Sequence, residues 1–251
     1  MKNNYHMHTY RCGHAAGTER EMALAASESG LLTAGFSDHS PFPGVPASRV
    51  RMAPEEIGEY VENVLEMKVE LKGKTDILLG FELEYFAPYF PKVMKMYDKY
   101  PVEFLILGQH YLGPDPYGHY VGRPCGEQEL TQYVDQSIEG MKTGVYLYFA
   151  HPDLPMFIGE DSFYEKEMTR LCEAAAKLDM PLEINLLGMR GGRNYPNERF
   201  WEIAGRVGNR VVLGLDAHAP EDTRDDASEA KAYEWAERFG FRIETELKLK
   251  W

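Results

Sequence analysis

The stretch Phe104-Leu105-Ile106-Leu107-Gly108-Gln109-His110 shows the pattern that decides the fold of this chain. A short apolar run, long enough for one buried strand, leads into a loop that carries a histidine. Similar runs recur along the chain, and amphipathic helical stretches separate them. Strands and helices that alternate in this way indicate an α/β fold with a parallel sheet, because each helix returns the chain to the start of the next strand.

The apolar runs predict seven strands. We expect them near 3–8, 32–38, 76–82, 103–109, 145–150, 181–186 and 210–215. The segment from Arg242 to Leu247 could add a short eighth strand. We therefore expect a closed or nearly closed seven-stranded barrel. A length of 251 residues suits a single barrel domain that spans residues 1–251.

Helical patterns fill the segments between these runs. Thr18 and Glu21 can form a capping box ahead of one helix. Residues 54–72 have apolar positions at helical spacing, with a proline in the first turn and Gly73 at the end. Further helices are expected near 127–142, 160–178, 197–207 and 226–239. Two long loops rich in Pro and Gly, 40–53 and 111–126, are expected to shape a pocket above the barrel.

The composition argues against several classes of protein. The formal net charge is −13 and no Lys/Arg cluster is visible, so binding to long nucleic acid is not expected. No apolar run approaches the roughly 18 residues that span a bilayer. The N-terminus lacks the apolar core of a signal peptide, so we expect a cytoplasmic protein without a membrane partner. Its cysteines, Cys12, Cys125 and Cys172, are too few for a disulfide framework. No interface stripe indicates an oligomeric state.

Histidines and carboxylates gather where the predicted strands end. His6 and His8 are two residues apart on one strand and therefore share a face. The other candidates at strand ends or in adjoining loops are His14, His39, Glu82, His110, His151, Asp216 and His218. The carboxyl ends of parallel strands meet at one end of a barrel. Neutral imidazoles and carboxylates together are the ligands of first-row transition metals, so the set predicts a metal site.

Other residues near the strand ends have more than one interpretation. Asp38 could orient a metal-bound histidine or cap a turn. Glu84 is expected to be a solvated loop residue. The candidates for phosphate or substrate binding are Arg11, Arg123, Arg190, Arg193 and His119. A guanidinium suits bidentate contacts with phosphate, although each arginine could instead form a surface ion pair, and His119 could simply lie on the surface.

In chain order, these motifs resemble the PHP (polymerase and histidinol phosphatase) family of metallo-phosphoesterases, and above all its monofunctional histidinol-phosphatase branch. The resemblance runs from His6 to His218 and is carried by His6-Met7-His8, Cys12-Gly13-His14-Ala15, Phe36-Ser37-Asp38-His39, Gly80-Phe81-Glu82, His110, Ala150-His151-Pro152-Asp153, Glu183-Ile184-Asn185 and Gly214-Leu215-Asp216-Ala217-His218. It implies a distorted (β/α)7 barrel and two to three divalent transition metals, which would be zinc, manganese or iron.

By position, the resemblance implies three metal sites with Glu82 as a bridge. The first would use His6, His8, Glu82 and Asp216, the second Glu82, His110 and His151, and the third His14, His39 and His218. Glu82, Asp216 and His218 are the expected catalytic residues. Two departures bear on the substrate rather than on the metals. Leu215 stands where a small residue is common in this branch, and the loop 111–126 matches no pattern of the family.

The expected activity is hydrolysis of L-histidinol phosphate to L-histidinol and orthophosphate, a step of histidine biosynthesis. A hydroxide held between the metals would attack phosphorus in line. Asp216, His218 or a metal-bound water would protonate the leaving oxygen. The alternatives are a PHP phosphoesterase acting on another small phosphate ester or a nucleotide 3′ end, an amidohydrolase-like metal hydrolase, and a non-catalytic metal-binding protein. An amidohydrolase typically needs a bridging lysine, and no strand end offers one in the matching position.

Overall fold

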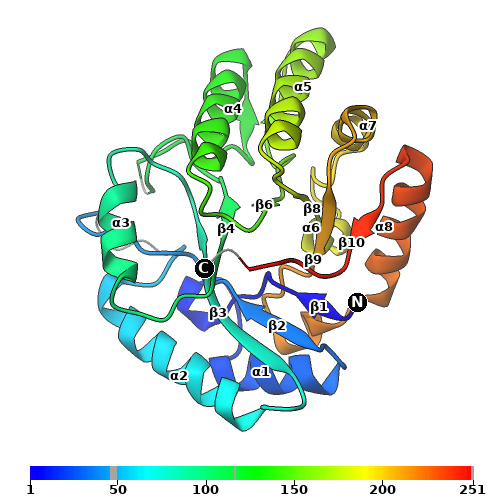
Figure 1. The fold of residues 1–251 in the computed structure, drawn as a ribbon. Coiled ribbons are helices and arrows are strands. Elements are labelled where there is room, and N and C mark those ends of the chain that lie inside the picture. The colour runs from blue at the N-terminus through cyan, green and yellow to red at the C-terminus, as the bar shows by residue number, and fades with distance from the viewer. Residues whose placement is uncertain (46–49, 116, 250–251) are drawn as a thin grey trace.

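A computed structural model describes residues 1–45, 50–115 and 117–249. Eight parallel strands form one curved sheet, with helices around its outside (Figure 1). In sheet order the strands are β1 (Asn3–Asn4), β2 (Thr33–Phe36), β3 (Asp76–Leu83), β4 (Phe104–Gly108), β6 (Phe149–Ala150), β8 (Leu182–Asn185), β9 (Val211–Gly214) and β10 (Ile243–Glu244). The α/β barrel predicted from the sequence is confirmed, and each of the seven predicted runs overlaps one of these strands.

The sheet closes into a barrel through residues that follow β1 and β9. Met7 forms an isolated parallel bridge with Ala217. His8 N–H donates to the Ala217 carbonyl at 2.9 Å, and Ala217 N–H donates to the His6 carbonyl at 3.2 Å. Seven strands therefore form a ring at their carboxyl ends.

The possible eighth strand in the segment 242–247 is present as β10. It lies between β1 and β9 at the amino ends of these strands, opposite the end where Met7 pairs with Ala217. β10 pairs with the first residues of β9, Val211 and Val212. Next to it, the Thr245 carbonyl accepts a hydrogen bond of 2.6 Å from Asn3 Nδ2 on β1. β10 thus fills the gap between β9 and β1 where those two strands do not pair directly.

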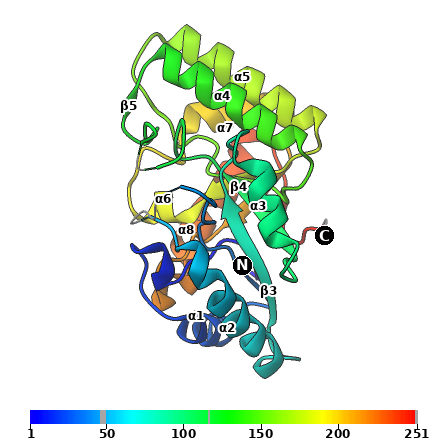
Figure 2. The same ribbon diagram turned by 90° about the vertical axis from the view of Figure 1, so that its left-hand side faces the viewer.

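Helices cover the outer face of the barrel. They are α1 (Glu19–Glu28), α2 (Ile57–Glu70), α3 (Phe90–Tyr97), α4 (Glu127–Lys142), α5 (Asp161–Lys177), α6 (Leu186–Arg190), α7 (Glu198–Val207) and α8 (Asp226–Phe239), with short 3-10 turns at Tyr10–Cys12, Pro54–Glu56 and Pro220–Thr223. The side view shows α1 beside α2 and α4 beside α5 (Figure 2). Among the helices in the described part of the chain, none is long and apolar enough to cross a membrane.

Local sequence signals account for some of the helix ends. Thr18 accepts from Glu21 N–H, and the Glu21 side chain accepts from Thr18 N–H, so the predicted capping box begins α1. Gly73 has a φ of +83° in the turn after α2, a conformation that glycine adopts without strain. The short helices α3 and α6 were not predicted, nor was a separate two-stranded sheet formed by β5 (Pro124–Cys125) and β7 (Met156–Phe157).

The barrel interior is packed and supports the site above it. Phe104 lies at its centre, because a Cβ atom placed on Gly35 or Gly80 would come within 2.7 or 2.4 Å of its ring. The other residues of this inner cluster are Tyr5, Leu78, Ile106, Leu147, Tyr148, Ala150, Val212 and Leu247. Side chains alternate along β3, so Leu78 and Glu82 point inward while Leu79 packs against the helices. The apolar floor therefore passes directly into a polar rim.

Candidate metal centre

Nine side chains converge at the carboxyl ends of the strands. They are His6, His8, His14, His39, Glu82, His110, His151, Asp216 and His218, which are the metal ligands that the sequence predicts. All but His6 and His8 line a cavity of about 720 Å³. His6 and His8 are fully buried beneath it. The strand ends thus bring together residues from six different strand–loop junctions.

Four of these side chains face a common point. His6 Nε2 lies 3.4 Å from both Glu82 Oε2 and Asp216 Oδ1. His8 Nε2 lies 3.4 and 3.3 Å from the same two oxygens. All four atoms are buried, and they have no hydrogen-bond partner among the described residues. Buried polar atoms without partners are costly, and a divalent cation coordinated by all four would remove that cost. The donor set therefore fits a metal ion.

The second oxygen of Glu82 faces a different pair of histidines. Glu82 Oε1 lies 2.9 Å from His151 Nε2 and 3.5 Å from His110 Nε2. Gly108 makes room for this carboxylate, because a Cβ at that position would lie 1.7 Å from Glu82 Oε1. Glu82 is therefore placed between two groups of nitrogen donors, which is the geometry of a bridging ligand.

The remaining histidines form a third group nearer the opening of the cavity. The ring centroid of His14 lies 4.9 Å from that of His218 and 5.3 Å from that of His39. Donor atoms of His8, His39 and His218 lie within 4.8 Å of one another, so this group adjoins the first. His39 Nδ1 also lies 3.0 Å from Glu82 Oε2, so its ring contacts the bridging carboxylate directly.

A further acceptor orients the His6 ring from behind, because His6 Nδ1 lies 2.7 Å from Glu183 Oε1. His8 Nδ1 lies 3.6 Å from Asp38 Oδ1, which is too long for a hydrogen bond. Asp38 is fully buried and accepts instead from Thr9 N–H at 3.2 Å. An acceptor at Nδ1 leaves the Nε2 lone pair free for a metal.

Two histidines nearer the opening are held by carbonyl groups instead. His14 Nδ1 lies 2.9 Å from the Cys12 carbonyl, and His218 Nδ1 lies 3.0 Å from the Asp216 carbonyl. These contacts are local, spanning two residues each, so the loop conformation itself fixes the ring positions. As in His6, Nε2 is left available in both rings.

The environment divides the histidines into two electrostatic classes. Burial, together with His218 and His8, lowers the pKa of His14 to about 4, and burial lowers the pKa of His110 to about 3. Burial also opposes the charged form of His8, but the neighbouring carboxylates Asp216, Asp38 and Glu82 outweigh it and raise its pKa to about 9. The first class is neutral at pH 7, whereas His8 must lose a proton to bind a metal.

The two central carboxylates are held in their charged form. Burial would raise their pKa values, but the surrounding histidines lower the pKa of Glu82 and of Asp216 well below the usual range. Both therefore present full negative charge to the cavity at neutral pH.

Three of the candidates for phosphate or substrate binding are absent from the described cavity lining. Arg11 is buried and pairs with Glu19. Arg190 donates to the Leu215 carbonyl at 2.7 Å and the Asp216 carbonyl at 3.1 Å, so its guanidinium supports the chain beside the site. His119 lies on the surface and is absent from the described cavity lining. The sequence pattern did not reveal the 3-10 turn that carries Arg11 or the helix α6 that ends at Arg190.

Arg123 and Arg193 do line the cavity. Within the described residues, neither guanidinium pairs with a carboxylate. Arg193 Nη1 donates to Tyr195 Oη at 2.7 Å. Their charge is therefore available to an anion bound in the cavity.

Sequence reasoning missed a buried ion cluster at the edge of the cavity. Arg51 lines the cavity and lies 2.7 Å from Glu84 Oε2, and it also pairs with Asp115. The expectation that Glu84 is solvated is wrong, because this side chain is buried and accepts from His110 N–H and Tyr111 N–H at 2.9 Å each. Its spacing of two residues from Glu82 was the available signal, since it places both on one face of the strand.

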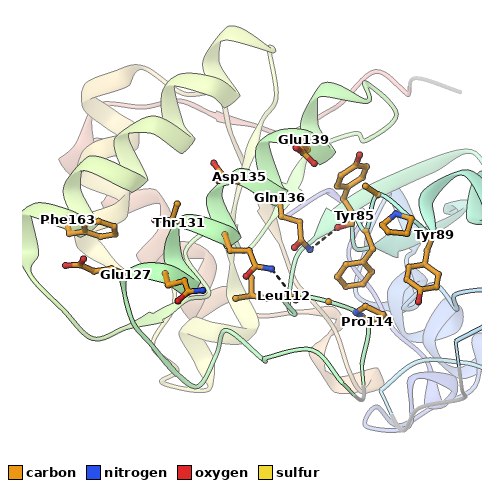
Figure 3. Close-up of a pocket in the computed structure, with 16 residues that line it drawn as sticks. Tyr85, Tyr89, Leu112, Pro114, Glu127, Thr131, Asp135, Gln136, Glu139 and Phe163 are labelled. Carbon is orange, nitrogen blue, oxygen red and sulfur yellow. Dashed lines mark hydrogen bonds between the residues drawn. The ribbon is translucent and has the colours of Figure 1, made fainter.

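A larger cavity of about 910 Å³ lies elsewhere, between α4 and the segment 85–89 (Figure 3). Its carboxylates, which include Glu127, Asp135 and Glu139, are exposed and stand apart from one another. Leu112 lines this groove while the neighbouring Tyr111 lines the histidine cavity. The described groove lining contains no histidine, so the groove does not offer the same chemistry.

Comparison with known proteins points to one family. The PHP domain model matches residues 4–186. A probable histidinol-phosphatase of Deinococcus radiodurans is 31% identical, over 86% of this chain and 85% of that protein. A histidinol-phosphatase of Bacillus subtilis is 28% identical, over 88% and 95%. The structure of histidinol phosphate phosphatase from Lactococcus lactis, complexed with zinc, L-histidinol and phosphate, has a TM-score of 0.74 at 20% identity, over 100% of this chain and 99% of that one. That likeness shows the fold.

Proposed function

The chain belongs to the PHP family, and on that premise we propose that it is a metal-dependent phosphatase that hydrolyses L-histidinol phosphate to L-histidinol and orthophosphate. One observation carries the proposal. Four buried donor atoms, from His6, His8, Glu82 and Asp216, surround a common point and are unpartnered within the described structure. The substrate is taken from the histidinol-phosphatases among its relatives, and would place the enzyme in histidine biosynthesis.

We propose two to three divalent ions at this centre, with zinc, manganese and iron as candidates. The first would be held by the four donors around the common point, the second by Glu82, His110 and His151, and the third by His14, His39 and His218. Bound ions would draw electron density from phosphate oxygens and lower the pKa of water in the cavity. Mixed imidazole and carboxylate donors accept each of these metals.

The side chains of the cavity supply the remaining steps. Arg123 and Arg193 are placed to bind phosphate oxygens that the metals leave free, because a guanidinium donates two parallel hydrogen bonds to such a group. Asp216 is kept as a carboxylate with a pKa well below the usual range, so it is a weak base, and its proposed part is to orient the attacking water rather than to take its proton. His218 lines the cavity beside it and is proposed to help move protons near the leaving oxygen.

The outer part of the cavity suits a small aromatic leaving group. Tyr111, Tyr120 and Tyr195 are among the lining residues, and aromatic rings can bind an imidazole or an ammonium group. An amidohydrolase-like reaction is disfavoured, because the described lining contains no lysine. A second phosphate ester stays a candidate on one observation. Besides the proposed metal ligands, the charged side chains of the described lining are arginines, and two of them, Arg123 and Arg193, pair with no carboxylate among the described residues, which favours an ester with additional negative charge.

The decisive assay is orthophosphate release from L-histidinol phosphate by protein reconstituted with zinc or manganese. A kcat/KM of about 10⁴ M⁻¹s⁻¹ or more, within the ordinary enzyme range, is expected. The same protein should be compared on a small bisphosphate and on a nucleoside 3′-monophosphate. If kcat/KM is higher on either of these by orders of magnitude, L-histidinol phosphate is not the substrate, although the protein is still a phosphatase.

A further inference from the structure

The strand β8 differs from the other strands that surround the cavity. β1, β2, β3, β4, β6 and β9 each carry or lead into proposed ligands, whereas β8 supplies none of the nine. Its second residue, Glu183, is nevertheless fully buried and points toward the site. A buried carboxylate must be matched by donors or a cation, so the partners of Glu183 indicate what it does.

Glu183 joins ligands that come from different strands. Its Oε1 lies 2.7 Å from His6 Nδ1, and its Oε2 accepts from His151 N–H at 3.0 Å. Oε2 also accepts from Asn185 Nδ2 at 3.0 Å, and the same amide nitrogen donates to Asp216 Oδ2 at 3.0 Å. The carboxylate and the amide therefore tie together the ligands that follow β1, β6 and β9.

Gly214 is shaped for this arrangement. A Cβ atom at Gly214 would lie 1.7 Å from Glu183 Oε1, so the neighbouring strand leaves space for this carboxylate. Gly108 provides equivalent space for Glu82 Oε1. A glycine on the neighbouring strand thus leaves space for Glu183, which contributes no proposed ligand atom, just as one does for the bridging Glu82.

Two of the contacted ligands have a backbone conformation that needs support. His151 has a φ of +34° and Asp216 a φ of +48°, and Asp179 is the other described non-glycine residue with a positive φ. A positive φ costs energy in a residue with a Cβ and persists where neighbours hold it. Glu183 holds the amide of His151, and Asn185 holds the side chain of Asp216.

We propose that Glu183 is a positioning residue that fixes His6 with its proton on Nδ1 and sets the place of His151. The proton on Nδ1 leaves the Nε2 lone pair of His6 facing the metal position. The groups at His6 Nδ1, His151 N and Asn185 Nδ2 all act as donors, and only a carboxylate accepts from all three. A glutamine would oppose one of them with its own N–H groups. This inference rests on the metal centre proposed above.

The test is the Glu183→Gln variant, which retains the size of the side chain. Zinc affinity is measured by competition with a chromophoric chelator, and zinc content by elemental analysis. We expect affinity to fall roughly 10–100-fold, as for other residues that orient metal ligands. The matched control is Glu167→Gln, which alters a buried carboxylate on α5 that pairs with Arg170, and its zinc affinity should equal that of the wild type. Wild-type affinity in Glu183→Gln would overturn the inference.

A second measurement needs no variant. In zinc-loaded wild type labelled with ¹⁵N-histidine, the ring of His6 should show a protonated Nδ1 hydrogen-bonded to a carboxylate and an unprotonated Nε2. A proton on Nε2 would overturn the inference even if Glu183→Gln fails to fold. The proposed function fails separately, if wild-type protein binds no zinc or releases no orthophosphate.

Discussion

The rim of strand ends and the loops above it are built in different ways. Except for His14, which is held by its own loop, each proposed ligand on the rim lies within a strand or a few residues beyond one, so pairing between neighbouring strands fixes its place. The two loops, 40–53 and 111–126, lie above that rim without such pairing to the barrel, and their residues 46–49 and 116 lie outside the described structure. Ligand positions therefore follow from local sequence. The two loops, which we call the cover of the cavity, depend instead on contacts between distant residues.

Arg51 provides the main contact that links the two loops. Its guanidinium donates to the Ser40 carbonyl at 2.9 Å and to Glu84 at 2.7 Å, and it pairs with Asp115. It thereby joins the first loop, the end of β3 and the second loop in one buried cluster. A single cation in the cover thus has the connecting role that strand pairing has in the rim.

The rim is most sensitive at its bridging carboxylate. Replacing Glu82 by Gln removes the negative charge shared by the donor groups, so turnover should fall by orders of magnitude and zinc content should drop. Orthophosphate release and elemental analysis of the purified variant check this. His119→Asn, which alters an exposed histidine outside the described cavity lining, should behave as wild type. Near-normal turnover of Glu82→Gln would contradict the assignment.

The cover should be most sensitive to replacement of Arg51. Its replacement by Met leaves Glu84 and Asp115 buried without their cation, which should cost about 3–5 kcal/mol of unfolding free energy. KM should rise because the cavity wall loosens, while zinc content is retained. Urea unfolding and steady-state kinetics measure both effects. Arg20→Met, which removes an exposed pair with Glu70, should change stability by less than about 1 kcal/mol. If Arg51→Met and Arg20→Met change the unfolding free energy and KM equally, Arg51 does not hold the cover together.

A smaller effect is expected where the cover meets the proposed phosphate position. Arg193→Gln should lower kcat/KM roughly 10–100-fold, because a hydrogen bond to a charged group contributes about 1.5–3 kcal/mol. Arg199→Gln is the matched control, since this arginine pairs with Asp161 on the surface. If both variants retain wild-type kinetics, Arg193 does not bind the phosphate.

The smallest predicted effect is a pH dependence of metal stabilisation. In the metal-free protein His8 has its pKa raised from the ordinary 6.5 to about 9. Its protonated form therefore adds stability that is fully present below pH 6.5 and is lost as pH rises through about 9. Metal binding requires the neutral ring and displaces fewer protons at higher pH. The difference in Tm between zinc-loaded and chelator-treated protein should thus widen from pH 6.5 to 9, and a difference that narrows would contradict this.

The sequence predicts the rim well because its signals are local. An apolar run followed by a histidine, as at Phe104 to His110, identifies both a strand and its functional end. The contacts of Glu183 with His6 and His151 could not be predicted, since a charged residue inside an apolar strand does not show which side chains surround it. Arg51 and Asp115 are 64 residues apart and carry no periodic signal. The helix α3 was not predicted because the two prolines at its start, Pro88 and Pro91, are typical of a loop.

The measurement that tests the central claim most directly is a zinc titration of chelator-treated protein, followed by calorimetry and orthophosphate release in parallel. The account predicts that two to three equivalents bind per chain, that activity on L-histidinol phosphate rises with them, and that Glu82→Gln loses both. Full activity in protein with less than one equivalent of any divalent metal would contradict the account.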